Sequence, residues 1–511
     1  MMTAQERKDF RRVQKSRDIW KKRAVRRGED RRRIRQRHQE VDRSRTGWRE
    51  RALEAENRTR QLEIEHHQLN SALTRAPELP TINNTHFFLS YLHLHLVFNC
   101  TLSFRASSKV LSSFLLVGAG LISWVPHFTT GIGWALRVGL HCLQQAQCHL
   151  DEKWVCIADF TIQIGAKKAF IVLRVPVAAF SQGKALTLKQ VDVIGLSLGE
   201  TWNGERVKTY LQSLFELCGW PSHVVSDCGS DIKKGIADAL LEAPNQASWM
   251  SDVTHFVANA LKHYYAKLSL FQQFQSLCTR IRQRLQQTQL AFLLPPKARA
   301  KGRFLSVSRQ AQWGLQTLNY LEAKEREHSP EATALAQALR GLKSFKLFLM
   351  TLVRNTTCLN EVMKMVKTQG LSAASIQACQ ERLGDLPVRS PMRKEVSHYL
   401  QHYLPIVALS ESPLLGSSDV IESLIGKAKQ RLEANGRNEL NKSILLIPCM
   451  CGELTQDLVA EALSTVSVQD VTTWVSENVG ETMQSKRRRE FPRSQPPKPG
   501  IETAEPLAGT G

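Results

Sequence analysis

The spacing of apolar residues changes near residue 153, from a helical period to a strand-like one. Alternating apolar positions predict a strand hairpin in "KWVCIADFTIQI" and "KAFIVLRVPV", followed by a third strand in "LKQVDVIGLSL". A helical segment then leads to a short strand that ends in "HVVSD", and another helix follows it. Because a strand reached through such a crossover runs parallel to the first strand, this block predicts an α/β layer architecture.

Two helical stretches precede this block, with a glycine-rich break and Pro126 between them. This arrangement is the outline of a helix-turn-helix. In that motif the second helix lies in the major groove of DNA, and Thr129, Thr130 and Arg137 would be the exposed candidates for contact. The alternative interpretation is an ordinary helical hairpin inside a core.

Helical periodicity returns after the strands and persists almost to the C-terminus, where a proline-rich, charged tail follows. No strand signal of comparable strength appears in that part of the chain. The predicted organisation is a basic helical arm at 1–75, a helix-turn-helix-like DNA-binding region at 76–150, the first part of an α/β core at 151–255, a helical insertion at 256–410, a core-completing helix at 411–435, a helical appendage at 436–484 and a disordered tail at 485–511.

The charge of the chain indicates a polyanionic partner. The 511 residues carry a formal net charge of +22, and the first 60 hold 22 Lys and Arg against 10 Asp and Glu, a surplus of 12. Such an arm can neutralise DNA phosphates without reading sequence. The 11 cysteines are scattered and form no C-x-x-C pair, which argues against a disulfide framework and favours a reducing cytosol. The uncharged stretches contain polar or Gly-Pro interruptions, so we expect buried helices rather than membrane spans.

Two aspartates occupy unusual places in the predicted sheet. Asp159 shares one strand face with Val155 and Ile157, where a charge is costly unless it is paired or binds a cation. Asp227 ends the "HVVSD" strand at the carboxyl edge, where α/β folds collect their ligands. Ordinary turn chemistry before Cys-Gly is the alternative explanation of Asp227.

Two later segments carry further candidates. Asp252 and His255 have a D-x-x-H spacing at a predicted helix start, where they would support a metal carboxylate or contact a scissile strand. An N-capping aspartate with a surface histidine is the simpler alternative. Glu422 lies at the border of an apolar helical stripe in "SSDVIESLIGKAKQR", which would point its carboxylate at the sheet edge. A capping box between Asp419 and Glu422 explains the same spacing locally.

The order of these motifs resembles that of bacterial DDE transposases of insertion sequences. The resemblance covers roughly residues 103–435 and rests on Asp159 in the hairpin, "VVSDCGSD" on the fourth strand, "DVTH" at a helix start and "SSDVIESLIGKAK" after a helical stretch. It implies a ribonuclease-H-like core that is interrupted by an α-helical insertion before the last acidic residue.

The same resemblance implies a triad of Asp159, Asp227 and Glu422 that is both catalytic and metal-binding. Asp231 or Asp252 could take the place of Asp227 if the strand ends are placed differently. Two Mg²⁺ or Mn²⁺ ions would stabilise the attacking and leaving oxygens during phosphodiester cleavage and strand transfer. Without metal, three clustered carboxylates would repel one another and take up protons.

The implied partner is double-stranded DNA, both the ends of the element and its target. Lys427, Lys429 and Arg431 would hold phosphates that flank the scissile bond, and the protein would work as a homo-oligomer on DNA in the bacterial cytoplasm, at the nucleoid. Two other classes fit the same residues. One is a non-enzymatic DNA-binding protein, such as a repressor or a domesticated transposase remnant, and the other is a ribonuclease-H-like nuclease without strand transfer.

Overall fold

The structure is a computed structural model, and it describes residues 16–17, 20, 86–117, 124–147, 152–164, 167–180, 183–297, 304, 307–328, 331–433 and 440–491. The chain divides into two compact units, Met1–Asn83 and Asn84–Gly511. All elements below belong to the second unit. The predicted basic arm lies almost entirely outside the described residues, and so does most of the predicted tail.

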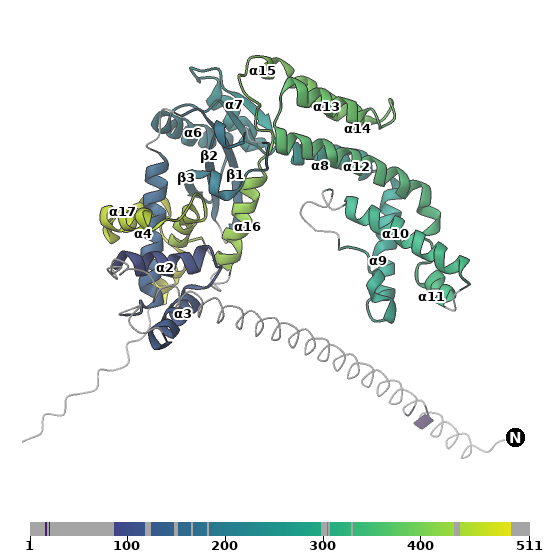
Figure 1. Cartoon of the computed structure of the whole chain (residues 1–511), viewed down its shortest axis with the longest axis horizontal. Coiled ribbons are helices and arrows are strands. Elements are labelled where there is room, and N and C mark those ends of the chain that lie inside the picture. The colour runs from purple at the N-terminus through teal and green to yellow at the C-terminus, as the bar shows by residue number, and fades with distance from the viewer. Residues whose placement is uncertain are drawn as a thin grey trace, which may run out of the picture. The chain divides into compact units, whose positions relative to one another are not determined.

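A mixed five-stranded sheet forms the centre of the second unit (Figure 1). Its order is β3-β2-β1-β4-β5; β2 pairs antiparallel with both β1 and β3, whereas β4 is parallel to both β1 and β5. The strands are β1 (Trp154–Ile164), β2 (Lys167–Pro176), β3 (Asp192–Gly199), β4 (His223–Ser226) and β5 (Ser248–Ser251). The predicted hairpin, third strand and parallel crossover are therefore confirmed. The fifth strand was not predicted.

Both faces of the sheet are buried, as the uninterrupted apolar strands predict. Along β1, Val155 and Ile157 face one core, while Cys156 and Ala158 face the other. The second core is closed by α6 (Gly204–Cys218) and α7 (Ser230–Leu240). The first core is covered by α8 (Val253–Tyr265) and α16 (Asp419–Glu433), and α16 packs against β1 (Figure 1).

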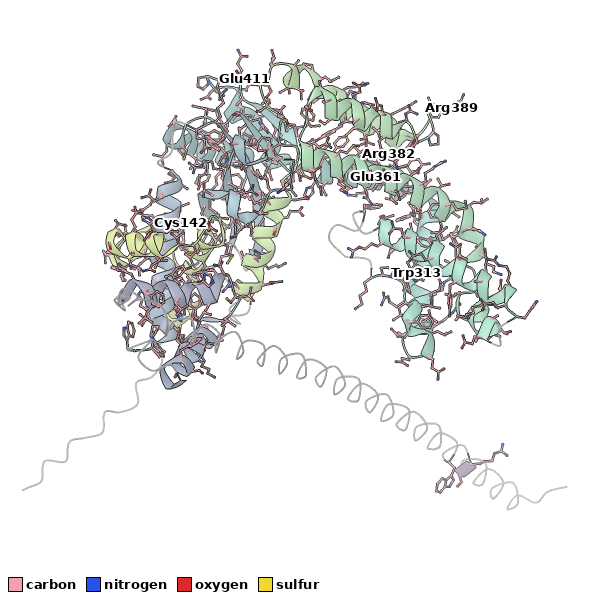
Figure 2. All side chains as sticks on the ribbon, viewed as in Figure 1. Cys142, Trp313, Glu361, Arg382, Arg389 and Glu411 are labelled. Atoms are coloured by element: carbon pink, nitrogen blue, oxygen red, sulfur yellow. The ribbon has the colours of Figure 1, made fainter. Side chains whose placement is uncertain are left out.

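Helices separate α8 from α16 in the chain, as the predicted insertion requires. They are α9 (Ser269–Leu285), α10 (Val307–Arg326), α11 (Glu331–Ala338), α12 (Lys346–Gln369), α13 (Ala373–Leu383), α14 (Pro391–His402) and α15 (Leu404–Ala408). Both α12 and α14 contact α8, and their buried residues continue the core on that face of the sheet. An ion pair between Glu361 and Arg382 joins α12 to α13 (Figure 2).

The helices before and after the core share a hydrophobic cluster of their own. The N-terminal ones are α2 (His86–Phe98), α3 (Phe104–Val117) and α4 (Phe128–Ala146), and the C-terminal ones are α17 (Gln456–Thr465) and α18 (Val468–Asn478). The helix that follows them, α19 (Met483–Glu490), has no buried residue. Trp134 and Leu140 of α4 and Val459 and Leu463 of α17 are among its buried members. The segment expected to be an appendage is therefore packed on the helix-turn-helix-like region.

The remaining short elements are α5 (Val177–Phe180), η1 (Leu188–Gln190), η2 (Gln289–Leu293), η4 (Lys343–Phe345), η5 (Lys442–Leu446) and η6 (Pro448–Met450). The cysteines that the structure describes are all free. Among the described helices, none is long and apolar enough to cross a membrane.

Candidate active site

Asp159 lies on β1 and faces the side of the sheet that α16 covers, as its alternation with Val155 and Ile157 predicts. One carboxylate oxygen, Oδ1, accepts a hydrogen bond of 2.7 Å from the backbone N–H of Phe160. Burial raises the pKa of the Asp159 carboxyl to about 7, and the nearby charges of Asp227 and Glu422 add to this rise. Asp159 therefore takes up a proton at a higher pH than a free aspartate does when no cation is bound.

Asp227 follows β4, which is parallel to β1 and adjacent to it. The carboxyl end of β4 therefore brings Asp227 beside Asp159, and the two charges interact. Its Oδ1 also accepts a hydrogen bond of 3.0 Å from the N–H of Gly229, so the predicted turn role is real and coexists with a place in the acidic cluster. Asp231, the alternative candidate, is exposed in the first turn of α7.

Glu422 lies one turn into α16, at the edge of its buried stripe. Ile421, Leu424 and Ala428 are buried on the predicted apolar side, whereas the Glu422 side chain is 43% exposed. Burial raises the pKa of the Glu422 carboxyl, although His255 opposes the shift. The three candidate acids thus come from a strand, a strand end and a helix, and the charges of Asp227 and Glu422 both raise the pKa of Asp159.

The side chains of Asp419 and Glu422 do not form the capping box that their spacing predicted. Asp419 accepts a hydrogen bond of 3.1 Å from the Thr254 hydroxyl and pairs with the Lys367 ammonium at 2.6 Å. Glu422 Oε1 lies 3.4 Å from His255 Nε2. The capping explanation fails because both carboxylates point to partners on other helices.

Asp252 and His255 form a linked pair beside the acidic cluster. Asp252 is the N-cap residue of α8, as the simpler alternative expected, but it is only 1% exposed. The hydrogen bond between His255 Nδ1 and Asp252 Oδ1, 3.2 Å long, is the main cause that raises the pKa of His255 to about 9. Burial alone would raise the pKa of Asp252, but the bonds from His255 and Ser418 outweigh it and lower that pKa. A protonated His255 therefore lies between two carboxylates, Asp252 and Glu422.

The donor chemistry of the cluster suits a hard divalent cation. Mg²⁺ prefers oxygen ligands and is commonly bound through one or two carboxylates, and Asp159 and Asp227 are such a pair. Their coupling and the raised pKa of Asp159 are what adjacent carboxylates show when no cation balances them. Over the part of the chain that the structure describes, no group of three or more His, Cys, Asp or Glu side chains is arranged to hold one ion. Glu422 is instead turned to His255.

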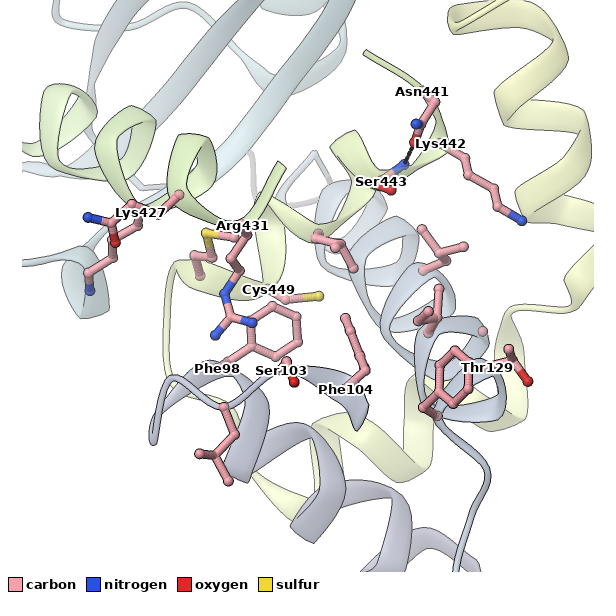
Figure 3. A pocket seen from close by; sticks show the side chains of 18 of the residues that line it. Phe98, Ser103, Phe104, Thr129, Lys427, Arg431, Asn441, Lys442, Ser443 and Cys449 are labelled. Carbon is pink, nitrogen blue, oxygen red and sulfur yellow. Dashed lines mark hydrogen bonds between the residues drawn. The ribbon is translucent and has the colours of Figure 1, made fainter. Parts of the chain in front are cut away.

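A large basic cleft lies beyond the other end of α16 (Figure 3). It encloses about 3090 Å³ between α2, α4, α16, η5 and α19, and half-buried rings such as Phe98, Phe104 and Phe128 line it. Its charged lining residues are seven basic ones and one acidic one, Arg105, Lys189, Lys427, Arg431, Lys442, Arg487, Arg488 and Glu453. This surface carries a net positive charge and faces solvent on one side.

The candidate DNA-contacting residues fall into two groups in this region. Thr129 and Thr130 are exposed in the first turn of α4, and Thr129 lines the basic cleft. Arg137 is not exposed as predicted. It is half-buried, and its guanidinium donates hydrogen bonds to the carbonyl oxygens of Val466 and Leu463. The reason is that α17 packs across this side of α4, so Arg137 caps the end of α17.

The three basic residues predicted to hold phosphates also differ from one another. Lys427 is exposed in the cleft, and Arg431 lines it as well (Figure 3). The Arg431 guanidinium donates a hydrogen bond to the Val97 carbonyl and lies 5.0 Å from the centre of the Phe98 ring. Lys429 is half-buried and does not line the cleft. Only Lys427 is placed as a simple phosphate contact would require.

One residue of the site was missed in the sequence. Ser418 precedes the first residue of α16, and both its backbone N–H and its hydroxyl donate to the buried Asp252 carboxylate. A serine immediately before an apolar helical stripe is a helix-start signal, which could have singled it out. Its partner, 166 residues earlier, leaves no trace in the local sequence.

Comparison with known proteins finds likeness in structure but none in sequence. No protein-family model matches the chain, and no curated protein sequence matches it. A similar solved structure is that of the Drosophila P element transposase strand transfer complex, with a TM-score of 0.37 and 14% sequence identity. The likeness covers 79% of this chain and 98% of that chain. A likeness at this level assigns no family to the chain.

Proposed function

We propose that this chain is a DNA transposase of the insertion-sequence type, which cleaves DNA strands at the ends of its element and joins them to target DNA. The observation that carries the proposal is that the pairing of β1 with β4 and the packing of α16 on β1 bring Asp159, Asp227 and Glu422 near one another. These acids come from segments far apart in the sequence, and Asp159 has a pKa of about 7 as a result of burial and of its acidic neighbours. Carboxylates that lie close together at the end of a sheet destabilise the fold. Their placement is therefore best explained by a function.

Asp159 and Asp227 would hold a divalent cation, and Glu422 would complete the set once its side chain turned from His255. When bound, Mg²⁺ or Mn²⁺ supplies charge stabilisation for the attacking and leaving oxygens of a phosphodiester. His255, protonated at neutral pH because its pKa is about 9, places a positive charge next to Glu422. From there it can donate a hydrogen bond to a phosphate oxygen of the scissile strand.

The basic cleft supplies a surface for the DNA that flanks the cleaved bond. Lys427 follows Glu422 by five residues on α16, which corresponds to about 7.5 Å along the helix axis. The helical period also puts Lys427 about 140° round α16 from Glu422, so a strand whose scissile phosphate lies at the acids would have to curve round the helix to reach the cleft. The net positive lining would hold phosphates without reading sequence, and the exposed Thr129 and Thr130 would be the nearest candidates for base contact.

The test uses the full chain with DNA that carries the ends of its element and with target DNA, in Mg²⁺ or Mn²⁺. We expect nicks at the element ends and joined products, both abolished by Asp227→Asn and both retained by the exposed control Asp231→Asn. Nicks without joined products would identify a nuclease instead. Specific DNA binding without any metal-dependent nick would leave a DNA-binding protein and refute the catalytic proposal.

A further inference from the structure

A single buried carboxylate, that of Asp252, joins the N-terminal ends of two helices. Its Oδ1 accepts a hydrogen bond of 2.7 Å from the backbone N–H of His255, in the first turn of α8. Its Oδ2 accepts bonds of 2.6 Å and 3.0 Å from the backbone N–H and the hydroxyl of Ser418, which immediately precedes α16. Because N–H groups at helix starts have no partner within their own helix, a carboxylate shared by two of them is well satisfied in spite of its burial.

The two helices that meet at Asp252 carry His255 and Glu422 into the site. His255 lies three residues after Asp252, and Glu422 lies four residues after Ser418, so each is one turn beyond the shared carboxylate. Because both helix starts are attached to Asp252, His255 Nε2 lies 3.4 Å from Glu422 Oε1. A shift of α16 at Ser418 would therefore move the Glu422 carboxylate relative to Asp159 and to His255.

The segment before α16 is held to the same elements by further bonds. The N–H of Val253 donates to the Gly416 carbonyl at 3.0 Å, and His223 Nε2 lies 3.2 Å from the Leu415 carbonyl oxygen. These bonds fix the path of the chain up to residue 416. The attachment continues through the bonds of Ser418 to Asp252, and through those of Asp419 to the Thr254 hydroxyl and the Lys367 ammonium.

We propose that Asp252 is a positioning residue, which acts through Ser418 to fix Glu422 at the place where it can share a cation with Asp159 and Asp227. The inference rests on the proposed metal-binding role of these acids. Asp252 itself stays out of the reaction, because its four hydrogen bonds occupy both carboxylate oxygens. Groups that orient metal ligands in this way typically change metal affinity by about 10- to 100-fold when they are removed.

The test compares Ser418→Ala, Ser418→Thr and Asp252→Asn in the full chain, with Ser423→Ala as an exposed control on α16. Binding of Mn²⁺ is measured by calorimetry without DNA, and hydrogen exchange reports on the backbone amides of residues 419–422. We expect Ser418→Ala to weaken Mn²⁺ binding about tenfold and to speed exchange in the first turn of α16, and Asp252→Asn to do more. Ser418→Thr keeps the hydroxyl and should restore both quantities, whereas the control should change neither.

The outcomes separate this inference from the proposed function. Faster exchange in Ser418→Ala with Mn²⁺ affinity unchanged would make the contact structural only and overturn the positioning role. If the parent chain binds Mn²⁺ with the expected variant effects but never nicks DNA, the transposase proposal fails and the positioning role stands. If the parent chain binds no Mn²⁺, both fail. If Asp252→Asn does not fold, the comparison of Ser418→Ala with Ser418→Thr still tests the positioning role.

Discussion

Replacing Asp159 by asparagine should make the metal-free protein more stable at alkaline pH, although the same change should abolish metal-dependent cleavage. Asp159 is an acid whose pKa is raised by folding, from 3.8 to about 7. The folded state therefore disfavours its ionised form, and stability is lost as the pH rises from the unfolded pKa to the folded one. Asparagine has the same shape and no charge, so it avoids this loss.

The size of the effect follows from the two pKa values. At pH 8 the cost of ionising Asp159 in the folded state is about 4 kcal/mol, and at pH 5 it is about 2 kcal/mol, from roughly 1.4 kcal/mol per pKa unit. Changes in hydrogen bonding at the Phe160 N–H affect both pH values alike. The difference between the two pH values, on the order of 2 to 3 kcal/mol, is therefore the quantity to compare with experiment.

The assay is urea unfolding of the parent and Asp159→Asn proteins at pH 5 and pH 8 in the presence of a chelator. We expect the variant to gain more at pH 8 than at pH 5, and Asp231→Asn, on an exposed helix start, to show no such pH dependence. Adding Mn²⁺ at pH 8 should stabilise the parent and leave the variant unchanged. An effect of Asp159→Asn that does not vary with pH would show that Asp159 ionises freely and would refute the acidic-cluster reasoning.

Four further outcomes are expected. Glu422→Gln should fold and bind DNA like the parent but lose Mg²⁺- or Mn²⁺-dependent nicking, because the amide lacks the charge that holds the cation; near-parental cleavage would remove Glu422 from the site. Arg137→Ala should lower the free energy of unfolding by about 1–3 kcal/mol through the lost bonds to α17, and lost discrimination between DNA sequences without lost stability would contradict this. Since the pKa of His255 is raised to about 9, its stabilising contribution is present below pH 6.5 and disappears toward pH 9, so His255→Gln should be destabilised at pH 6 and much less so at pH 9.5 in urea unfolding. Deleting residues 1–60 should weaken binding to all DNA sequences and make the plot of log K against log salt shallower by about one unit per lost phosphate contact; an unchanged slope would show that the arm does not contact phosphates.

The sheet was largely predictable because strand alternation is a local property. The period of two in β1 gave both the strand and the face on which Asp159 lies. The fifth strand, Ser248–Ser251, was missed because a serine stands at each end of its four residues, whereas the equally short β4 contains two adjacent valines. Its place at the edge of the sheet depends on pairing with β4, which only the folded chain reveals.

The sequence could indicate which residues belong to the site, but not which residues their side chains contact. The boundary position of Glu422 follows from the helical period of α16, whereas its neighbour His255 lies 167 residues earlier, beyond any local pattern. Arg137 was wrongly predicted to be exposed, again because its partners are distant in the sequence. Its own helix leaves it on a polar side, and the helix that covers it begins more than 300 residues later.

The long separation between Asp252 and Ser418 has a consequence for the order in which the chain folds during synthesis. The contact closes a loop of 166 residues, which contains the whole of α9 to α15. Strands β1 to β5 can leave the ribosome and pair while Glu422 has yet to be made, so a nascent chain has the sheet without its last acid. Because contacts of such high sequence separation form slowly and late, the site is completed only after the intervening helices have emerged and packed on α8. Truncated chains that end within those helices would then lack both the last acid and the packing of α16 on the sheet.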